Sequence, residues 1–213
     1  MDVNTISGHL KYKFIVFEGL DGSGKGTQIK ILADKLSSLG CDKVFLTCEP
    51  TKYATGKILR DALSGQEKRT PEELAGLFLA DRIAHCENPS DGIKAMLQSG
   101  AAVICDRYYY SSFAYQGMDT DLKWVMDANL CCPKIIKPDV CIFLDVPPRV
   151  SDERIASRNN PREIYEQADK IARIRQKYMD VFELLPDHNI KIINASGDVN
   201  EVSKRISDAL GIG

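Results

Sequence analysis

Two patterns of apolar positions alternate along the chain. Short segments that are β-branched and almost continuously apolar are typical of parallel strands buried on both faces. Five segments have this character: Lys13–Glu18, Lys43–Thr47, Ala101–Cys105, Asp139–Leu144 and Ile190–Ile193. Between them, apolar residues recur every three or four positions, the spacing of a helix with one buried face. The pattern therefore predicts strands that alternate with helices from end to end.

Residues that start and stop helices support this alternation. The first helical segment carries a row of apolar residues on one face: Ile29, Leu32, Leu36 and Leu39. Gly40 follows the row, and glycine is common just past the end of a helix. A later helix is predicted to begin at Pro71, with Thr70 as its N-cap and Glu73 as the capping-box partner.

Alternating strands and helices predict an α/β fold. Right-handed crossovers put helices on both faces of the sheet, so we expect a three-layer α/β/α sandwich around a five-stranded parallel sheet. No internal repeat or low-complexity tract is visible, and we assign residues 1–213 to one domain. Ligands bind such sheets at the carboxyl ends of the strands. This rule places four segments around one crevice: Asp21–Thr27, Glu49–Pro50, Asp106–Arg107 and Asp145.

The composition narrows the class of protein. The formal net charge is −2, so no overall positive field would attract nucleic acid or an anionic membrane. No apolar run approaches the roughly 20 residues of a membrane span, and Met1–Lys11 lacks the apolar core of a signal peptide. Of seven cysteines, Cys105 and Cys141 lie within apolar runs. This usage favours a reducing cytoplasm over a disulfide framework or a zinc site.

A glycine-rich segment between the first strand and the first helix is the strongest functional signal. It reads Gly19-Leu20-Asp21-Gly22-Ser23-Gly24-Lys25-Gly26-Thr27. Glycines let backbone N–H groups surround an anion, the helix N-terminus adds a positive dipole, and Lys25 can reach the outer phosphates of a nucleoside triphosphate. Gly26 stands where Ser or Thr usually binds Mg²⁺, and the hydroxyl follows at Thr27. The alternative is a glycine-rich turn that binds no ligand.

A basic segment at about residues 151–165 is predicted to be a lid. Arg154, Arg158 and Arg162 recur at four-residue spacing, and Asn159-Asn160-Pro161 interrupts the helix. Arginines four residues apart share a helix face. Near a phosphate-binding loop, such a segment suits a mobile cover over a triphosphate. The alternative is a solvated surface helix.

Carboxylates and arginines supply the other parts of a phosphoryl-transfer site. Such a site must hold the phosphates in line and neutralise their charge. Asp106 and Asp145 each follow an apolar strand, where a carboxylate can hold Mg²⁺ or its waters. Arg60, Arg82 and Arg107 can clamp an acceptor phosphate, since a guanidinium pairs with two phosphate oxygens. Each arginine taken alone would more often be a surface salt-bridge residue.

The order of these motifs resembles the thymidylate kinase family over nearly the whole chain. The matching segments are Phe17–Lys25, Glu49–Pro50, Leu77–Arg82, Asp106–Tyr108, Ser111–Gly117 and Phe143–Val146. The Asp-Arg-Tyr and Ala-Tyr-Gln-Gly pieces are the most specific, because a phosphate-binding loop alone names only a superfamily. The resemblance implies a fold of the P-loop NTP hydrolase type and transfer of the γ-phosphoryl group of ATP to dTMP. It also implies a requirement for Mg²⁺ and a homodimer.

The resemblance implies roles for individual residues in a dTMP site. Asp21 would contact the 3′-hydroxyl group, Phe78 would stack on thymine, and Tyr115 would pack under the sugar. Arg60 and Arg107 would hold the phosphate. The base edge would be read by Arg82, Ser112 and Gln116. The full implied set is Asp21, Glu49, Pro50, Arg60, Phe78, Arg82, Arg107, Ser111, Ser112, Tyr115 and Gln116.

The other implied roles concern ATP and Mg²⁺. The nucleotide set comprises Gly19, Asp21, Gly22, Ser23, Gly24, Lys25, Gly26, Thr27 and Arg154. Catalysis is assigned to Lys25, Asp106, Arg107, Arg158 and Arg162. Metal contact, directly or through water, is assigned to Thr27, Glu49 and Asp106; Glu49 and Asp106 would order either the waters of Mg²⁺ or the arginines. One branch of the family has an arginine where this chain has Gly22, so the lid arginines would take its place. The turn Asn194–Gly197 would lie near adenine.

Two departures from the family pattern leave alternatives open. The second loop reads Cys48-Glu49-Pro50-Thr51-Lys52 where many relatives have Arg-Glu-Pro-Gly-Gly. Gly24–Thr27 is similar to an adenylate kinase loop, which favours a kinase for dUMP, UMP or AMP. The Ser112, Tyr115 and Gln116 block argues against that alternative. A P-loop regulatory ATPase without an acceptor pocket is the other alternative.

Overall fold

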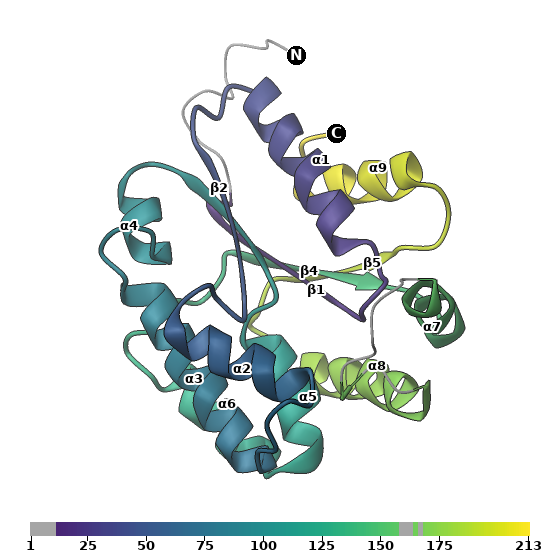
Figure 1. The fold of residues 1–213 in the computed structure, drawn as a ribbon. Helices are drawn as coiled ribbons and strands as arrows, with labels where there is room; N and C mark the ends of the chain where they lie inside the picture. Colours follow the sequence, from purple (N-terminus) through teal and green to yellow (C-terminus); the bar gives the residue numbers. More distant parts are fainter. Residues whose placement is uncertain (1–11, 158–163, 166–167) are drawn as a thin grey trace.

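The computed structural model describes residues 12–157, 164–165 and 168–213, and its centre is a five-stranded sheet (Figure 1). The strands are β1 (Phe14–Gly19), β2 (Val44–Cys48), β3 (Ala102–Asp106), β4 (Val140–Asp145) and β5 (Ile190–Asn194). They pair in parallel in the order β2-β3-β1-β4-β5. Each strand begins and ends within one residue of the predicted range, so the predicted parallel sheet is confirmed.

Helices cover both faces of this sheet. They are α1 (Lys25–Ser38), α2 (Ala54–Leu63), α3 (Pro71–Glu87), α4 (Ile93–Gln98), α5 (Tyr109–Asp119), α6 (Leu122–Leu130), α7 (Pro148–Ala156), α8 (Ala168–Glu183) and α9 (Val199–Leu210). Helices α1 and α9 lie on one side, and α3, α5, α6 and α8 gather on the other (Figure 1). The predicted α/β/α sandwich is confirmed.

The predicted helix boundaries are also found. Thr70 accepts a hydrogen bond from the backbone N–H of Glu73, and the Glu73 side chain accepts one from the backbone N–H of Thr70. This capping box begins α3 with Pro71 in its first turn. After α1, Gly40 has a φ of 87°, a conformation that glycine adopts without steric cost.

The three central strands are more deeply buried than the edge strands. All of β1 is buried, and so are β3 and β4 except for their last residues. On the edge strands, Leu46 and Ile192 are 43% and 52% exposed. The register sets Phe17 opposite Asp106 and Gly19 opposite Leu144. The carboxyl ends of β1, β3 and β4 therefore meet at one edge of the sheet, where ligands bind in this class of fold.

The described residues contain no helix with the length and apolar character that a membrane span needs. All seven cysteines fall within this part of the chain and are free thiols. Cys86, Cys105 and Cys141 are buried in the core, where reduced cysteine packs as a small apolar side chain.

Candidate active site

The phosphate loop (Gly19–Thr27) forms an open turn between β1 and α1. Gly22 and Gly24 have φ angles of 77° and 96°, a region that residues with a Cβ rarely adopt. A Cβ at Gly24 or Gly26 would meet nothing within 4 Å, so the space beside the loop is clear. No side chain caps the N-terminus of α1. The loop and the first turn of α1 can therefore accept an anion.

Lys25 is folded back onto this loop. Its Nζ atom donates hydrogen bonds to the carbonyl oxygens of Gly19 and Leu20, each at 3.1 Å. Burial lowers the pKa of Lys25, Arg107 lowers it further, and nearby carboxylates such as Asp106 oppose the shift. A bound polyphosphate would offset the lowering, because it brings negative charge next to the ammonium group. Lys25 is thus placed to exchange backbone acceptors for phosphate oxygens.

A cavity of 240 Å³, here called the acceptor cavity, opens beside the loop. It is lined by Asp21, Glu49, Pro50, Arg60, Leu63, Phe78, Arg82, Arg107, Tyr108, Ser111, Tyr115, Gln116 and Tyr165. The structure thus brings together every residue predicted for the dTMP site except Ser112. The Ser112 hydroxyl instead accepts a hydrogen bond from Arg82 at 3.2 Å.

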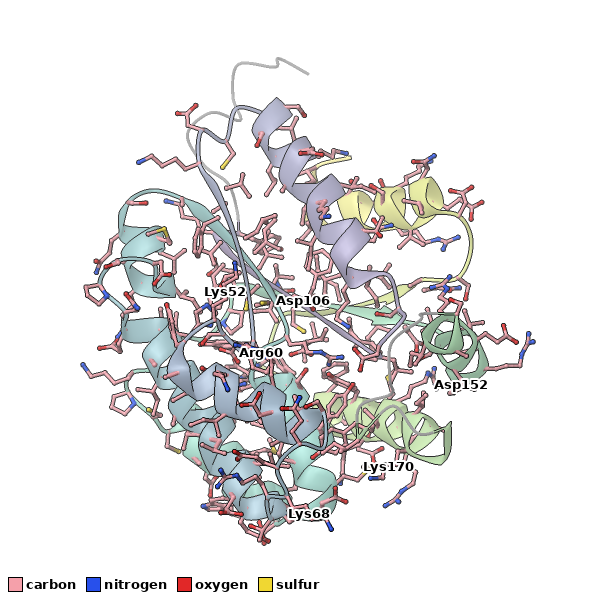
Figure 2. The ribbon with its side chains drawn as sticks, in the orientation of Figure 1. Lys52, Arg60, Lys68, Asp106, Asp152 and Lys170 are labelled. Carbon is pink, nitrogen blue, oxygen red and sulfur yellow. The ribbon has the colours of Figure 1, made fainter. Side chains whose placement is uncertain are left out.

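Arg60 enters the acceptor cavity from α2. Its Nη1 atom donates to the backbone carbonyl oxygens of Thr51 and Pro50. Figure 2 labels Arg60 on α2 and Asp106 at the end of β3, with Lys52 on the loop that follows β2. Arg60 is exposed, and no carboxylate within the described residues forms a salt bridge with it. Its charge is therefore available to an anionic ligand.

Arg82 is held by the buried side chains of Glu49, Ser112 and Asn129. Its Nε and Nη2 atoms donate to Glu49 Oε2 at 2.9 and 2.6 Å, and Nη1 donates to Asn129 Oδ1 at 2.6 Å. Burial alone would lower the pKa of Arg82, but the Glu49 carboxylate opposes this and the net direction is upward. Arg82 therefore remains charged although its side chain is only 1% exposed.

Glu49 belongs to this cluster, and it contacts an arginine, one of the two roles expected for it. Its Oε2 atom accepts from Arg82, and its Oε1 atom lies 3.0 Å from His85 Nδ1. The Glu49 side chain is only 2% exposed. Both carboxylate oxygens thus have protein partners, and Glu49 orders an arginine and a histidine; its contact with Mg²⁺ or its waters stays a prediction.

Arg107 has a strained backbone at the end of β3. Its φ of 67° is the one positive value at a non-glycine residue within the described chain. Its guanidinium donates to Asp21 Oδ1 at 2.7 Å and to Ser111 Oγ at 3.1 Å, and lies 5.1 Å from the ring centre of Tyr115. Such strain costs on the order of 1–3 kcal/mol and persists only where neighbours require it. Here it directs Arg107 toward the phosphate loop.

Glu18 supports this strained turn from the core. Its carboxylate accepts hydrogen bonds from the backbone N–H groups of Tyr108 and Ser111, at 2.8 and 3.1 Å. It also accepts from the hydroxyls of Ser111 and Tyr178. Burial raises the pKa of Glu18, while Arg107 and these hydrogen bonds oppose the rise. Sequence reasoning gave Glu18 no role, although a charged residue inside an apolar strand was a usable signal.

A second cavity of 340 Å³, here called the phosphate-loop cavity, lies at the start of α1. It is lined by Gly22, Ser23, Gly24, Thr27, Gln28, Arg154, Ala195, Gly197, Val199 and Val202. Ala195 and Gly197 belong to the turn that was expected to lie near adenine. They share this cavity with the loop hydroxyl of Thr27, which leaves room for a nucleotide between the loop and the turn.

Polar atoms suited to a metal-bound phosphate lie at the same edge of the sheet. Asp106 Oδ1 and Ser23 Oγ are buried and have no hydrogen-bond partner within the described structure. Thr27 is exposed in the phosphate-loop cavity. No three His, Cys, Asp or Glu side chains of the described residues are grouped to hold a metal. This donor set fits Mg²⁺ that keeps mostly water and phosphate oxygens as ligands.

Helix α7 packs directly on the phosphate loop. Ser151 Oγ donates to the Asp21 carbonyl oxygen at 2.6 Å, and Arg154 Nη1 donates to the Gly22 carbonyl oxygen at 3.0 Å. A Cβ at Gly22 would lie 3.0 Å from the Ser151 carbonyl oxygen and 3.1 Å from Arg154 Cβ. Glycine at position 22 therefore lets α7 pack closely against the loop, because it has no Cβ. Two predicted lid arginines fall outside the described residues: Arg158 and Arg162.

Asp145 ends β4 as expected but does not reach either cavity. Its two carboxylate oxygens accept from Arg175 Nε and Nη2 at 2.7 and 2.8 Å. The predicted place of Asp145 in the crevice, and its option as a metal ligand, are therefore corrected. Asn129 and Tyr165 are site residues that sequence reasoning missed, and no local motif marks either of them.

Comparison with known proteins gives a consistent result. A family model described as "Thymidylate kinase" matches residues 17–206. A relative from Thermococcus kodakarensis, named "Probable thymidylate kinase", is 40% identical over 202 residues, which cover 91% of this chain and 94% of the relative. Relatives of the same name from Pyrococcus horikoshii and Methanococcus vannielii are 37% and 39% identical over 199 and 194 residues. Those alignments cover 91% and 89% of this chain, and 93% and 90% of the relatives.

Proposed function

The chain belongs to the thymidylate kinase family, and on that premise we propose how its residues divide the reaction. The chain transfers the γ-phosphoryl group of ATP to the phosphate of dTMP, giving dTDP and ADP. The acceptor cavity carries the assignment of sites, because it collects arginines, aromatic rings and an amide beside the phosphate loop. We place dTMP in the acceptor cavity and ATP in the phosphate-loop cavity. The family match does not favour another acceptor or a regulatory ATPase.

In this proposal dTMP is bound at both of its ends. Arg82 donates to a carbonyl oxygen of thymine while Phe78 stacks on the ring. Arg60 and Arg107 bind the phosphate at the other end. Tyr115, whose ring lies beneath the Arg107 guanidinium, packs under the sugar, where a ribose 2′-hydroxyl would collide with it. Asp21, which pairs with Arg107, contacts the 3′-hydroxyl group.

The chemistry then requires positioning and charge more than proton transfer. An acceptor phosphate is already largely ionised near neutral pH, so no strong general base is needed. Lys25 and Arg107 neutralise charge on the transferring phosphoryl group. Arg154 already touches the loop, and we extend the lid role to Arg158 and Arg162. Closure would exclude water and suppress hydrolysis of ATP.

Thymidylate kinases in general use ATP and Mg²⁺. In this chain Thr27 and Asp106 would hold the ion, directly or through its waters. When bound, the ion supplies positive charge at the β- and γ-phosphates. Asp106 also lies close enough to Lys25 for its charge to act on the pKa of that lysine, so one carboxylate would order both groups.

The decisive test is ADP release measured with a panel of acceptors: dTMP, dUMP, dCMP, UMP and AMP. We expect dTMP to stimulate ADP release most strongly and Lys25→Met to abolish the stimulation. Ser37→Ala, on the far end of α1, is a matched control that should keep it. ADP release that is no faster with dTMP than with ATP alone would exclude the proposed function.

We also propose a homodimer and a cytoplasmic location. Trp124 and Leu130 on α6 are 44% and 40% exposed, and exposed apolar side chains on one short helix favour an interface between copies. Light scattering should give twice the chain mass, and Trp124→Glu should shift it toward one chain. A single-chain mass for the unaltered protein would exclude the dimer. The cytoplasmic location stays a prediction from the cysteine usage.

A further inference from the structure

Four side chains form a continuous hydrogen-bonded chain behind the acceptor cavity. Thr47 Oγ1 lies 2.7 Å from His85 Nε2, and His85 Nδ1 lies 3.0 Å from Glu49 Oε1. The other oxygen of Glu49 accepts from Arg82 Nε and Nη2 at 2.9 and 2.6 Å. We call these residues the Thr47–Arg82 relay.

The charged members of the relay and its histidine are buried. The side chains of Glu49, Arg82 and His85 are 1–2% exposed. A carboxylate only accepts hydrogen bonds, so His85 Nδ1 carries the hydrogen that meets Glu49. The Nε2 atom of His85 is then left to bond the Thr47 hydroxyl. A buried charge without a hydrogen-bond partner costs free energy. Each side chain of the relay is therefore held in the position that satisfies its neighbour.

The relay leaves Arg82 few free donors. A guanidinium has five N–H groups. Glu49 accepts from Nε and Nη2, and Asn129 and Ser112 both accept from Nη1. These contacts account for four N–H groups, so one N–H of Nη2 remains for a ligand in the acceptor cavity that Arg82 lines.

The far end of the relay lies outside the acceptor cavity. A separate cavity of 380 Å³ runs along the free edge of β2. It is lined by Phe45, Leu46, Thr47, Cys48, Thr51, Lys52, Tyr53, His85 and Asp91. Thr47 and His85 line this cavity and are absent from the wall of the acceptor cavity. The hydrogen bonds that connect them to Arg82 therefore run through Glu49.

We infer that His85 and Thr47 are positioning residues for selection of the base, an inference that rests on the proposed function. Thymine presents a carbonyl oxygen where cytosine presents an amino group. The remaining N–H of Arg82 donates a hydrogen bond to the carbonyl oxygen of thymine, whereas it faces another donor in the amino group of cytosine. Because the relay fixes which N–H faces the base, it sets the preference for dTMP over dCMP from outside the base pocket.

The test compares dTMP and dCMP kinetics at saturating ATP. For His85→Phe we expect about a tenfold rise in KM for dTMP and about a tenfold fall in the dTMP-to-dCMP ratio of kcat/KM, with kcat within about threefold. His85→Asn keeps a donor for Glu49 and should restore most of the ratio. Thr47→Val should lower it by about threefold. His188→Phe, the same substitution beside Tyr110, is the matched control and should keep the ratio.

The outcomes separate this inference from the proposed function. Unchanged ratios in His85→Phe and Thr47→Val would overturn the relay. If the dTMP-to-dCMP ratio of kcat/KM falls equally in His85→Phe and His85→Asn, the donor role of His85 Nδ1 is overturned. If His85→Phe does not fold, Thr47→Val and His85→Asn decide the matter. Failure of the unaltered protein to phosphorylate dTMP would instead exclude the proposed function.

Discussion

The acceptor cavity and the phosphate loop lie side by side, yet their polar groups are satisfied in opposite ways. Arg82 in the acceptor cavity is bonded to Glu49, Ser112 and Asn129. Beside the loop, by contrast, Ser23 Oγ and Asp106 Oδ1 are buried without partners in the described structure.

This difference indicates two modes of recognition. Base recognition is preorganised, because the protein supplies the counter-charge that holds its arginine. Phosphate recognition is left incomplete, because the ligand supplies the counter-charge that Lys25 and the loop need. We therefore expect substitutions in the acceptor cluster to reduce stability, and substitutions in the loop to reduce catalysis with little loss of stability.

The strongest test of this contrast removes the charge of Glu49. Glu49→Gln leaves the buried Arg82 guanidinium without its counter-charge, so the unfolding free energy should fall by roughly 3–5 kcal/mol. Urea denaturation followed by circular dichroism measures it. Glu67→Gln breaks an exposed pair with Arg69 and should leave the unfolding midpoint near the wild-type value. If Glu49→Gln also unfolds at the wild-type midpoint, Glu49 does not supply the counter-charge that holds Arg82 in place.

Lys25→Met tests the other side of the contrast. Loss of this charge should lower kcat by about 10²–10³-fold, as for removal of one electrostatic contact to the transition state. The unfolding free energy should stay level or rise, because methionine carries no charge for burial to penalise. Steady-state kinetics and urea denaturation on the same sample check both effects. A loss of stability as large as that of Glu49→Gln would contradict the contrast.

Gly22→Ala tests whether the phosphate loop can hold a side chain where α7 packs on it. The positive φ and the close Ser151 and Arg154 atoms predict a loss of about 1–3 kcal/mol in unfolding free energy. Thermal denaturation measures this loss. Gly26→Ala is the matched control, since it lies in α1 with clear space around it, and should stabilise by about 0.5–1 kcal/mol. Similar effects of the two changes would argue against α7 as the constraint.

The smallest expected effect is a pH trend at Glu18. Because the folded pKa of Glu18 is raised, the native protein binds this proton more readily than the unfolded chain. Its contribution to stability is therefore present below the ordinary pKa of 4.5 and is lost as pH rises from there through the folded pKa. Glu18→Gln removes this titration. The difference in unfolding free energy, wild type minus Glu18→Gln, should thus fall with rising pH, and a flat difference would exclude the raised pKa.

Local sequence pattern was sufficient for the elements and for the chemistry at their ends. Apolar runs located each strand to within one residue, and the Thr70 capping box marked the start of α3. The same pattern put the loop, Asp106 and Arg107 at one edge of the sheet. It succeeded because strand and helix propensities, caps and the parallel topology depend on neighbouring residues and on general rules of connection.

Only the tertiary structure decided which charge meets which partner. Glu49 is bonded to Arg82, 33 residues away, and Asp145 to Arg175, 30 residues away. Both carboxylates had been candidates for metal contact, Asp145 because it follows a strand and Glu49 because of the family resemblance. Sequence alone thus determined that phosphate chemistry belongs at this edge of the sheet. Packing of α3 and α8 determined which carboxylates remain available for it, because the ionic partner of a carboxylate depends on distances between elements far apart in the chain.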